Sequence, residues 1–222
     1  MSNRVGLIFD LDGTLIDSAP DIHATANLVF ARNGYGPFDF ATVRGFIGNG
    51  VGVLVARLMA HAGLPDAADL HDDLVSQFVT NYEQAVDLTT LYPGVDDALD
   101  NLAARGHPMA ICTNKPASPA RSVLRHFGLD RHFKVIIGGD SLPQRKPDPA
   151  PLLAAKVQLG SARILFVGDS EVDAETAVAA NEPLVLYSQG YRKIAAELLG
   201  AKAIFDHFDA LPGLVRHLEP RL

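Results

Sequence analysis

The chain has 222 residues, of which 48% are hydrophobic and 20% are charged, with a net charge of -7. This length and composition are typical of a globular protein with a sizeable core, in one large or two small domains. Because Lys and Arg are outnumbered by acidic residues and form no basic stripe, we expect neither nucleic acid nor a membrane as a partner.

The chain contains one cysteine, Cys112, which excludes an intramolecular disulfide and favours a reducing compartment. It falls inside a predicted strand, so we expect an inert thiol packed in the core. The apolar run at the N-terminus ends at Asp10, unlike a signal peptide, and no segment is long enough to span a bilayer. We therefore expect a cytoplasmic protein that is a monomer or a homodimer.

The first predicted element is a buried strand over Val5 to Phe9, and Asp10-Leu11-Asp12-Gly13-Thr14-Leu15 follows it directly. In an open parallel sheet, ligands bind beyond the carboxyl ends of the strands. Two carboxylates at such an end therefore predict a chemical role. An ordinary strand-to-turn exit is the alternative, because Asp and Gly are common turn residues.

Residues 16 to 88 have helical patterns and no convincing strand. One helix begins near Ser18, which resembles an N-cap because Asp21 follows three residues later, and ends at Gly34. A second runs from about Val51 to Ala62, and a third has its apolar residues on one face over 70–82. The block contains three arginines, no lysine and nine acidic residues. We expect an all-helical insertion between the first strand and the rest of the sheet.

From residue 92 onward, predicted helices and strands alternate. The expected helices lie at 95–106, 119–127, 149–159, 172–180 and 209–218, and the expected strands at 109–113, 135–138, 164–167, 184–187 and 203–205. This repetition predicts an α/β fold with a doubly wound parallel, Rossmann-like sheet. Residues 1–15 and 89–222 would form this core domain, and residues 16–88 the helical domain.

Polar residues follow four of the predicted strands. They are Asp10 and Asp12, then Thr113-Asn114-Lys115, then Lys146-Pro147-Asp148, and finally Gly168-Asp169 with Asp173. Each group alone is ordinary, as a turn, a solvent-facing lysine or a helix cap. Together they predict one site with carboxylates, a hydroxyl and an ammonium group at one edge of the sheet.

These four motifs, in this order, resemble those of the haloacid dehalogenase superfamily of phosphotransferases, over nearly the whole chain. The resemblance implies a phosphatase whose helical insertion is a cap over the site. Within the cap, residues 43–50 resemble the specificity loop of a branch that acts on 2-phosphoglycolate. One departure is Asn181-Glu182, where related chains usually have Gly before Pro, but Asn tolerates a left-handed backbone.

The residue types suit hydrolysis of a phosphate monoester, which is very slow in water. A carboxylate nucleophile, for which Asp10 is the candidate, divides the reaction into two steps. Asp12 is the candidate general acid and base. Four acids around a dianionic phosphate require a hard divalent cation with oxygen ligands, and Mg²⁺ fits best. The resemblance implies that Asp10 and Asp169 bind it through carboxylates, Asp12 through its carbonyl, and Asp173 from the outer shell.

For the substrate, a small phosphorylated metabolite, the resemblance implies that Thr113 and the Asn114 backbone hold phosphate oxygens, with Lys115 beside them. Lys146 would neutralise charge on the nucleophile and on the transferring group.

Arg44 is the cap cation beside a glycine-rich loop. We expect it to bind a substrate carboxylate together with the backbone of Gly48, Asn49 and Gly50. The alternative is a surface arginine beside a simple turn.

Four other functions share parts of this pattern. A receiver domain uses similar acids but has no place for the helical insertion. A dehalogenase needs neither the metal nor an acid at Asp12, and a phosphonate hydrolase would need a cap lysine, which residues 16–88 lack. A β-phosphoglucomutase-like sugar phosphomutase, or a sugar phosphatase, has the same core and cap and stays open.

Overall fold

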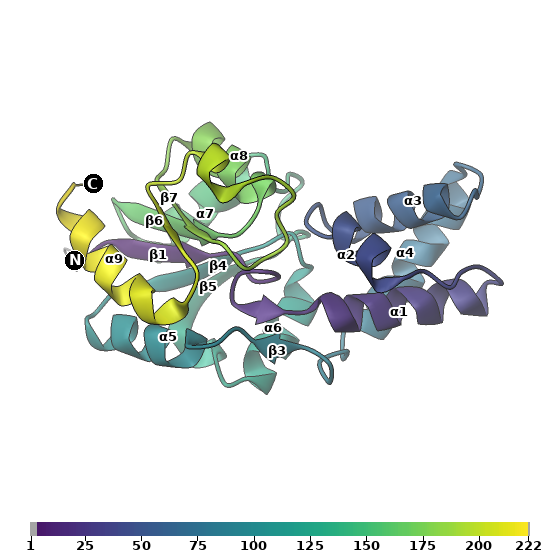
Figure 1. Cartoon of the computed structure of the whole chain (residues 1–222), viewed down its shortest axis with the longest axis horizontal. Helices are drawn as coiled ribbons and strands as arrows, with labels where there is room; N and C mark the ends of the chain where they lie inside the picture. The colour runs from purple at the N-terminus through teal and green to yellow at the C-terminus, as the bar shows by residue number, and fades with distance from the viewer. Residues whose placement is uncertain (1–3, 222) are drawn as a thin grey trace.

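The structure is a computed structural model that describes residues 4–221. It contains an α/β unit and a helical bundle that extends from one side of it (Figure 1). Six parallel strands form one sheet in the order β5-β4-β1-β6-β7-β8. Their bounds are Gly6–Phe9 (β1), Met109–Cys112 (β4), Phe133–Ile137 (β5), Ile164–Gly168 (β6), Leu184–Tyr187 (β7) and Ala203–Phe205 (β8). The predicted α/β class and parallel sheet are confirmed.

Helices cover both faces of the sheet and bury it. One face packs against α5 (Val95–Ala104), α6 (Ala117–His126) and α9 (Leu211–Leu218), and the other against α7 (Ala150–Leu159) and α8 (Glu171–Ala180). Short 3-10 turns lie at Asp130–His132, Ala196–Leu199, Phe208–Ala210 and Glu219–Arg221. Along β1, Leu7 and Phe9 enter one core and Ile8 the other, as the two-residue period of a strand requires. Burial on both faces explains the continuous apolar runs of the strands.

The bundle has an apolar core of its own. Its helices are α1 (Ala19–Arg32), α2 (Phe40–Phe46), α3 (Val51–His61) and α4 (Ala68–Tyr82). Phe30, Leu58 and Phe78 are fully buried in a cluster that contains only bundle residues. The division into domains at residues 16 and 88 stays a prediction, because Ile16 and Val86 pack with the core of the sheet. Residues 1–3 and 222 of the expected core domain lie outside the described residues.

A short antiparallel ribbon connects the two units, with β2 (Ile16–Asp17) entering the bundle and β3 (Thr90–Leu91) leaving it. The expectation that residues 16 to 88 hold no strand is therefore wrong at β2. Two paired residues are too few to show the alternation by which a strand is predicted. Beside the ribbon, the Thr89 hydroxyl donates to Asp21 at 2.6 Å, which fastens the start of α1 to the returning chain.

Helix α2 was not predicted either, because it has only seven residues and contains Gly45. Asp39 caps it by accepting from the Thr42 backbone N–H at 2.8 Å. Residues 43–46 of the expected loop are thus helical, and only Ile47 to Gly50 form a loop. Asn181 does have a left-handed backbone, with φ of 53°. No helix within residues 4–221 is long and apolar enough to cross a membrane.

Cys112 lies on β4 and is fully buried, and this burial raises the pKa of its thiol to about 12. Because the thiolate is the reactive form, we expect no modification of the native protein by a thiol reagent at about pH 8. Modification should appear only across the denaturant unfolding transition, as measured by mass spectrometry. Complete labelling of the native protein on mixing would contradict this placement.

Candidate active site

The site lies where the central strands end. β1 is flanked by β4 and β6, so Asp10, Thr113 and Asp169 leave neighbouring strands at the same edge of the sheet. Lys146 arrives from the segment before α7, and Asp173 from the first turn of α8. The chain runs from β1 through β4 to β5 on one side and returns at β6 on the other. The carboxyl edge at such a reversal is the usual ligand site of open α/β sheets.

Three carboxylates and one ammonium group are buried together at this edge. Asp10, Asp169 and Asp173 have carboxylate oxygens within 4.8 Å of one another. The Lys146 Nζ lies 3.0 Å from Asp10 Oδ1 and 2.7 Å from Asp173 Oδ1. One positive charge is thus shared among three negative charges, in a place from which water is largely excluded.

The pKa values reflect this excess of negative charge. Burial raises the pKa of Asp10 to about 7, against the attraction of Lys146 and with added repulsion from Asp173. Burial also raises the pKa of Asp169, and repulsion from Asp173 and Asp10 raises it further. For Lys146, burial lowers the pKa, but Asp10 and Asp173 outweigh it and hold the pKa well above its ordinary value. The cluster therefore has capacity for further positive charge.

The carboxylates differ in how fully they are hydrogen-bonded. Asp169 accepts from the Thr14 hydroxyl at 2.7 Å and from the Tyr191 backbone N–H at 2.6 Å. Asp173 Oδ2 accepts from the Asp169 N–H, the Ser170 N–H and the Ser170 hydroxyl at 2.8–3.1 Å. Asp10 Oδ1 is buried and has no hydrogen bond among the described residues besides its ion pair with Lys146. Asp10 and Asp169 are thus better placed than Asp173 to ligate an ion directly.

These residues fit a divalent cation. A hard ion such as Mg²⁺ takes oxygen ligands, commonly one or two carboxylates with the rest from substrate and water. A cation beside Asp10 and Asp169 would offset the charge that raises their pKa values and would give Asp10 Oδ1 a further partner.

Asp12 belongs to a different set of contacts. Its Oδ1 accepts from the Ser18 hydroxyl at 2.6 Å and from Lys115 Nζ at 3.0 Å. Ser18 does occupy the N-cap position of α1, but its side chain makes no capping bond, and its hydroxyl donates to Asp12 instead. The predicted position of Ser18 at the start of the helix is therefore correct, but the expected capping bond of its side chain is absent. Asp10 and Asp12 thus have separate partners.

Two cavities meet at Asp10 and Asp12. The smaller has a volume of about 40 Å³ and the larger about 280 Å³. Thr113, Asn114 and Lys115 line the smaller cavity, which the bundle closes with Ile22, Leu54, Phe78 and Tyr82. Asp169 and Tyr191 line the larger. Most of the predicted site residues therefore surround one connected space between the sheet edge and the bundle.

The bundle contacts this space through its loop and through α4. Gly48 lines both cavities, Gly50 the smaller and Asn49 the larger. The Asn114 side chain donates to the Gly48 carbonyl and to the Lys146 carbonyl, each at 2.9 Å. The Lys115 ammonium donates to the hydroxyl of Tyr82, at the end of α4. The predicted loop residues thus lie at the site as a wall of the cavities.

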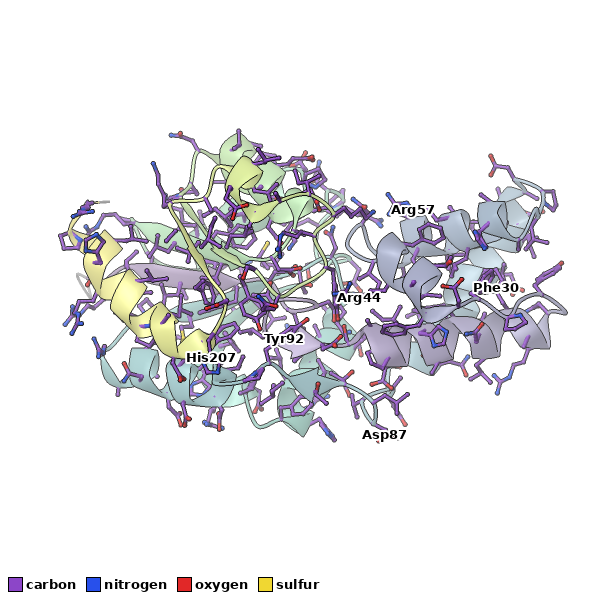
Figure 2. All side chains as sticks on the ribbon, viewed as in Figure 1. Phe30, Arg44, Arg57, Asp87, Tyr92 and His207 are labelled. Atoms are coloured by element: carbon purple, nitrogen blue, oxygen red, sulfur yellow. The ribbon has the colours of Figure 1, made fainter. Side chains whose placement is uncertain are left out.

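Arg44 lies where the bundle meets the α/β unit (Figure 2). Its guanidinium donates to the Gly190 carbonyl at 2.9 Å and sits 5.2 Å from the centre of the Tyr191 ring. It lines neither of the two cavities. Recognition of a substrate carboxylate by Arg44 stays a prediction, and the contact that the structure gives it is one between α2 and the core.

Sequence reasoning missed three residues that orient these acids. Thr14, within the first motif, has a hydroxyl that could have been assigned to a neighbouring acid. Ser170 and Asp173 form a capping box, whose three-residue spacing is visible in the sequence. Tyr191, by contrast, is 22 residues from Asp169 and has no local pattern that marks it.

The fold and the site together define a class of protein, an α/β enzyme with a carboxylate site at the carboxyl edge of its parallel sheet. The chain belongs to the haloacid dehalogenase-like hydrolase family, whose model matches residues 7–186. The resemblance inferred from the four motifs is confirmed.

Known relatives refine this assignment. The chain is 48% identical over 214 residues to a phosphoglycolate phosphatase from Cereibacter sphaeroides, covering 96% of this chain and 98% of the relative. The crystal structure of a predicted phosphoglycolate phosphatase from Haemophilus somnus 129pt is 32% identical, with a TM-score of 0.88. The match covers 96% of this chain and 99% of that chain. CbbY from Rhodobacter sphaeroides, solved in complex with phosphate, is 25% identical, with a TM-score of 0.77. This match covers 93% of this chain and 95% of that chain. The chain is therefore a phosphoric monoester hydrolase.

The raised pKa of Asp10 predicts how stability depends on pH without divalent cations. Because its pKa is about 7 when folded and 3.8 ordinarily, its contribution to stability is present below about pH 4 and is lost as pH rises through 7. We expect metal-free Asp10→Asn to be more stable than the unmodified chain at pH 8, by on the order of 1–4 kcal/mol. Urea unfolding should show this difference shrinking towards pH 4. Parallel curves would contradict the prediction.

Proposed function

We propose that the chain hydrolyses 2-phosphoglycolate to glycolate and phosphate, with Mg²⁺ and through an aspartyl-phosphate on Asp10. The main support for this proposal is the buried cluster of Asp10, Asp169, Asp173 and Lys146, which lies beside a cavity that Asp12 also lines. Near-full-length similarity to phosphoglycolate phosphatases supports the choice of substrate. Similarity to CbbY, solved with phosphate, supports a phosphate site on this fold.

In the first step, an Asp10 carboxylate oxygen attacks phosphorus and the bond from phosphorus to the glycolate oxygen breaks. Asp12 gives its proton to that leaving oxygen. The Lys146 ammonium, 3.0 Å from Asp10 Oδ1, offsets charge on the nucleophile and on the transferring group. Thr113 and the Asn114 backbone, on the cavity wall, hold the phosphate oxygens.

In the second step, Asp12 takes a proton from water as the water oxygen attacks phosphorus. The bond between phosphorus and Asp10 then breaks, which releases phosphate and restores both acids. The contacts of Asp12 with Ser18 and Lys115 keep its carboxylate near the reacting group in both steps.

Asp10, Asp169 and the Asp12 carbonyl would hold Mg²⁺, with Asp173 orienting them through the Asp169 N–H and Lys146. When bound, the ion supplies positive charge that allows a phosphate dianion to approach this acidic site.

The lining of the smaller cavity suits a small anionic leaving group. The cavity volume of about 40 Å³ is roughly three times what a cavity needs to hold one water molecule. Ile22, Leu54 and Phe78 make the bundle side apolar, and Lys115 is the cation on its wall. An anionic leaving group of a few atoms suits this wall, and the larger cavity of about 280 Å³ adjoins it at Asp10 and Asp12.

A panel of phosphomonoesters assayed with Mg²⁺ tests the proposal. We expect the largest kcat/KM for 2-phosphoglycolate, above that for glucose 1-phosphate and glucose 6-phosphate. A chelator should abolish the activity and Mg²⁺ should restore it, with Ca²⁺ a poor substitute because it prefers more ligands and looser geometry. Full activity in chelator would refute the Mg²⁺ assignment, and a preference for a glucose phosphate would refute the substrate.

Replacement of Asp12 tests the covalent mechanism. We expect Asp12→Asn to lower kcat for 2-phosphoglycolate on the order of 10²–10⁴-fold, because it removes the proton transfer. With p-nitrophenyl phosphate, whose leaving group needs no proton, the same variant should accumulate a phosphoryl group on Asp10. Acid quench, peptide digestion and mass spectrometry would locate it. Asp10→Asn is the matched control and should carry none.

Absence of the adduct from Asp12→Asn, under conditions where p-nitrophenol is released, would mean that the phosphoryl group passes directly to water.

A further inference from the structure

The first helix of the bundle does not cap itself. The N-terminal N–H groups of a helix lack partners within the helix and need an acceptor from elsewhere. Ser18 is at the N-cap position, but its hydroxyl donates to Asp12. The Ser18 and Ala19 N–H groups donate instead to the hydroxyl of Tyr191, at 2.8 and 3.0 Å. A core side chain, 173 residues away from Ser18, thus caps α1.

The Tyr191 hydroxyl uses all of its hydrogen-bonding capacity in these contacts. It accepts these two bonds and donates one to Asp17 Oδ1 at 2.8 Å. Asp17 lies in β2, at the entrance to the bundle. Tyr191 is 7% exposed, so water cannot easily replace any of these contacts. Removing the hydroxyl alone would leave the Ser18 N–H without its acceptor and Asp17 without this donor, while the Ala19 N–H would keep only its longer contact with Asp17 Oδ1, at 3.3 Å.

The backbone of Tyr191 contacts a second acid of the site, Asp169. Its N–H donates to Asp169 Oδ2 at 2.6 Å. The preceding Gly190 allows this approach, because a Cβ there would lie 2.2 Å from the same carboxylate oxygen. The Gly190 carbonyl accepts from Arg44 of α2. The segment that holds Asp169 therefore contacts the bundle at two points, the start of α1 and Arg44.

We propose that Tyr191 is a positioning residue that couples the placement of the bundle to the proton donor of the reaction. Through its hydroxyl it fixes the first turn of α1, and with it Ser18, whose hydroxyl holds the Asp12 carboxylate. Through its backbone it fixes Asp169 in the same segment. This role rests on the proposed function only in assigning proton transfer to Asp12.

Tyr191→Phe tests the coupling, because it removes the hydroxyl and keeps the ring and the backbone N–H. The matched control is Tyr92→Phe. Tyr92 is a half-buried tyrosine of the α/β unit (Figure 2), and its hydroxyl has no hydrogen bond within residues 4–221. We expect Tyr191→Phe to lower kcat for 2-phosphoglycolate about 10- to 100-fold, a part of what general acid catalysis contributes. KM should change less than kcat.

The leaving group provides a readout that a general structural defect would not change. Misplacing Asp12 slows expulsion of the basic glycolate oxygen but hardly that of p-nitrophenolate. The value of kcat/KM reports formation of the phospho-enzyme and not the shared hydrolysis step, so Tyr191→Phe should lose at least about tenfold more kcat/KM on 2-phosphoglycolate than on p-nitrophenyl phosphate. Equal losses on both substrates, or losses like those of Tyr92→Phe, would overturn the proposal. If 2-phosphoglycolate is not a substrate, any alkyl phosphate that the chain hydrolyses gives the same comparison, so the proposed substrate can fail separately.

Amide hydrogen exchange tests the contact without any turnover. In the unmodified chain and in Tyr92→Phe, the Ser18 and Ala19 amides should be protected. In Tyr191→Phe the Ser18 amide should exchange at least about tenfold faster, as expected for the loss of one net hydrogen bond, and the Ala19 amide should change less because it also donates to Asp17. The strands of the sheet should keep their protection. Unchanged protection of these two amides would show that the hydroxyl does not cap α1.

Discussion

The structure depends on burying three carboxylates against a single lysine at the end of the central strand. An uncompensated buried charge is costly, and it persists only where the surrounding fold holds it in place. Here the sheet supplies that rigidity, since β1 is hydrogen-bonded on both sides and its residues are fully buried on both faces. A divalent cation bound at this edge would restore the balance of charge, so the stability lost here would favour binding such an ion.

The bundle covers the acids at the edge of the sheet. At the sheet edge alone, Asp10 and Asp12 would face solvent, where water weakens electrostatic interactions. Tyr82 and the loop at Gly48 close the space above them through contacts with Lys115 and Asn114. The bundle thus forms one wall of the cavities, and its apolar side chains lower the polarity of the space beside Asp10 and Asp12.

Features of the fold and the site could be predicted where they correspond to a long enough pattern in the sequence. The apolar strand runs and the acids that follow them identified the sheet, its carboxyl edge and the cluster of Asp10, Asp169 and Lys146. Short elements such as β2 and α2 leave too few residues for a period to appear. The position of Arg44 on Gly190 depends on how two units pack together, which no local pattern encodes.

The ribbon of β2 and β3 has a consequence for how such a protein can be rebuilt. Asp17 and Thr90 are paired neighbours on adjacent antiparallel strands, so the chain leaves the bundle beside the point where it entered. A tight reverse turn of two residues can span that gap. We therefore expect that another insertion could replace the bundle at this point. Such an exchange would change the surface that covers the active site, while the register of the parallel sheet would stay the same.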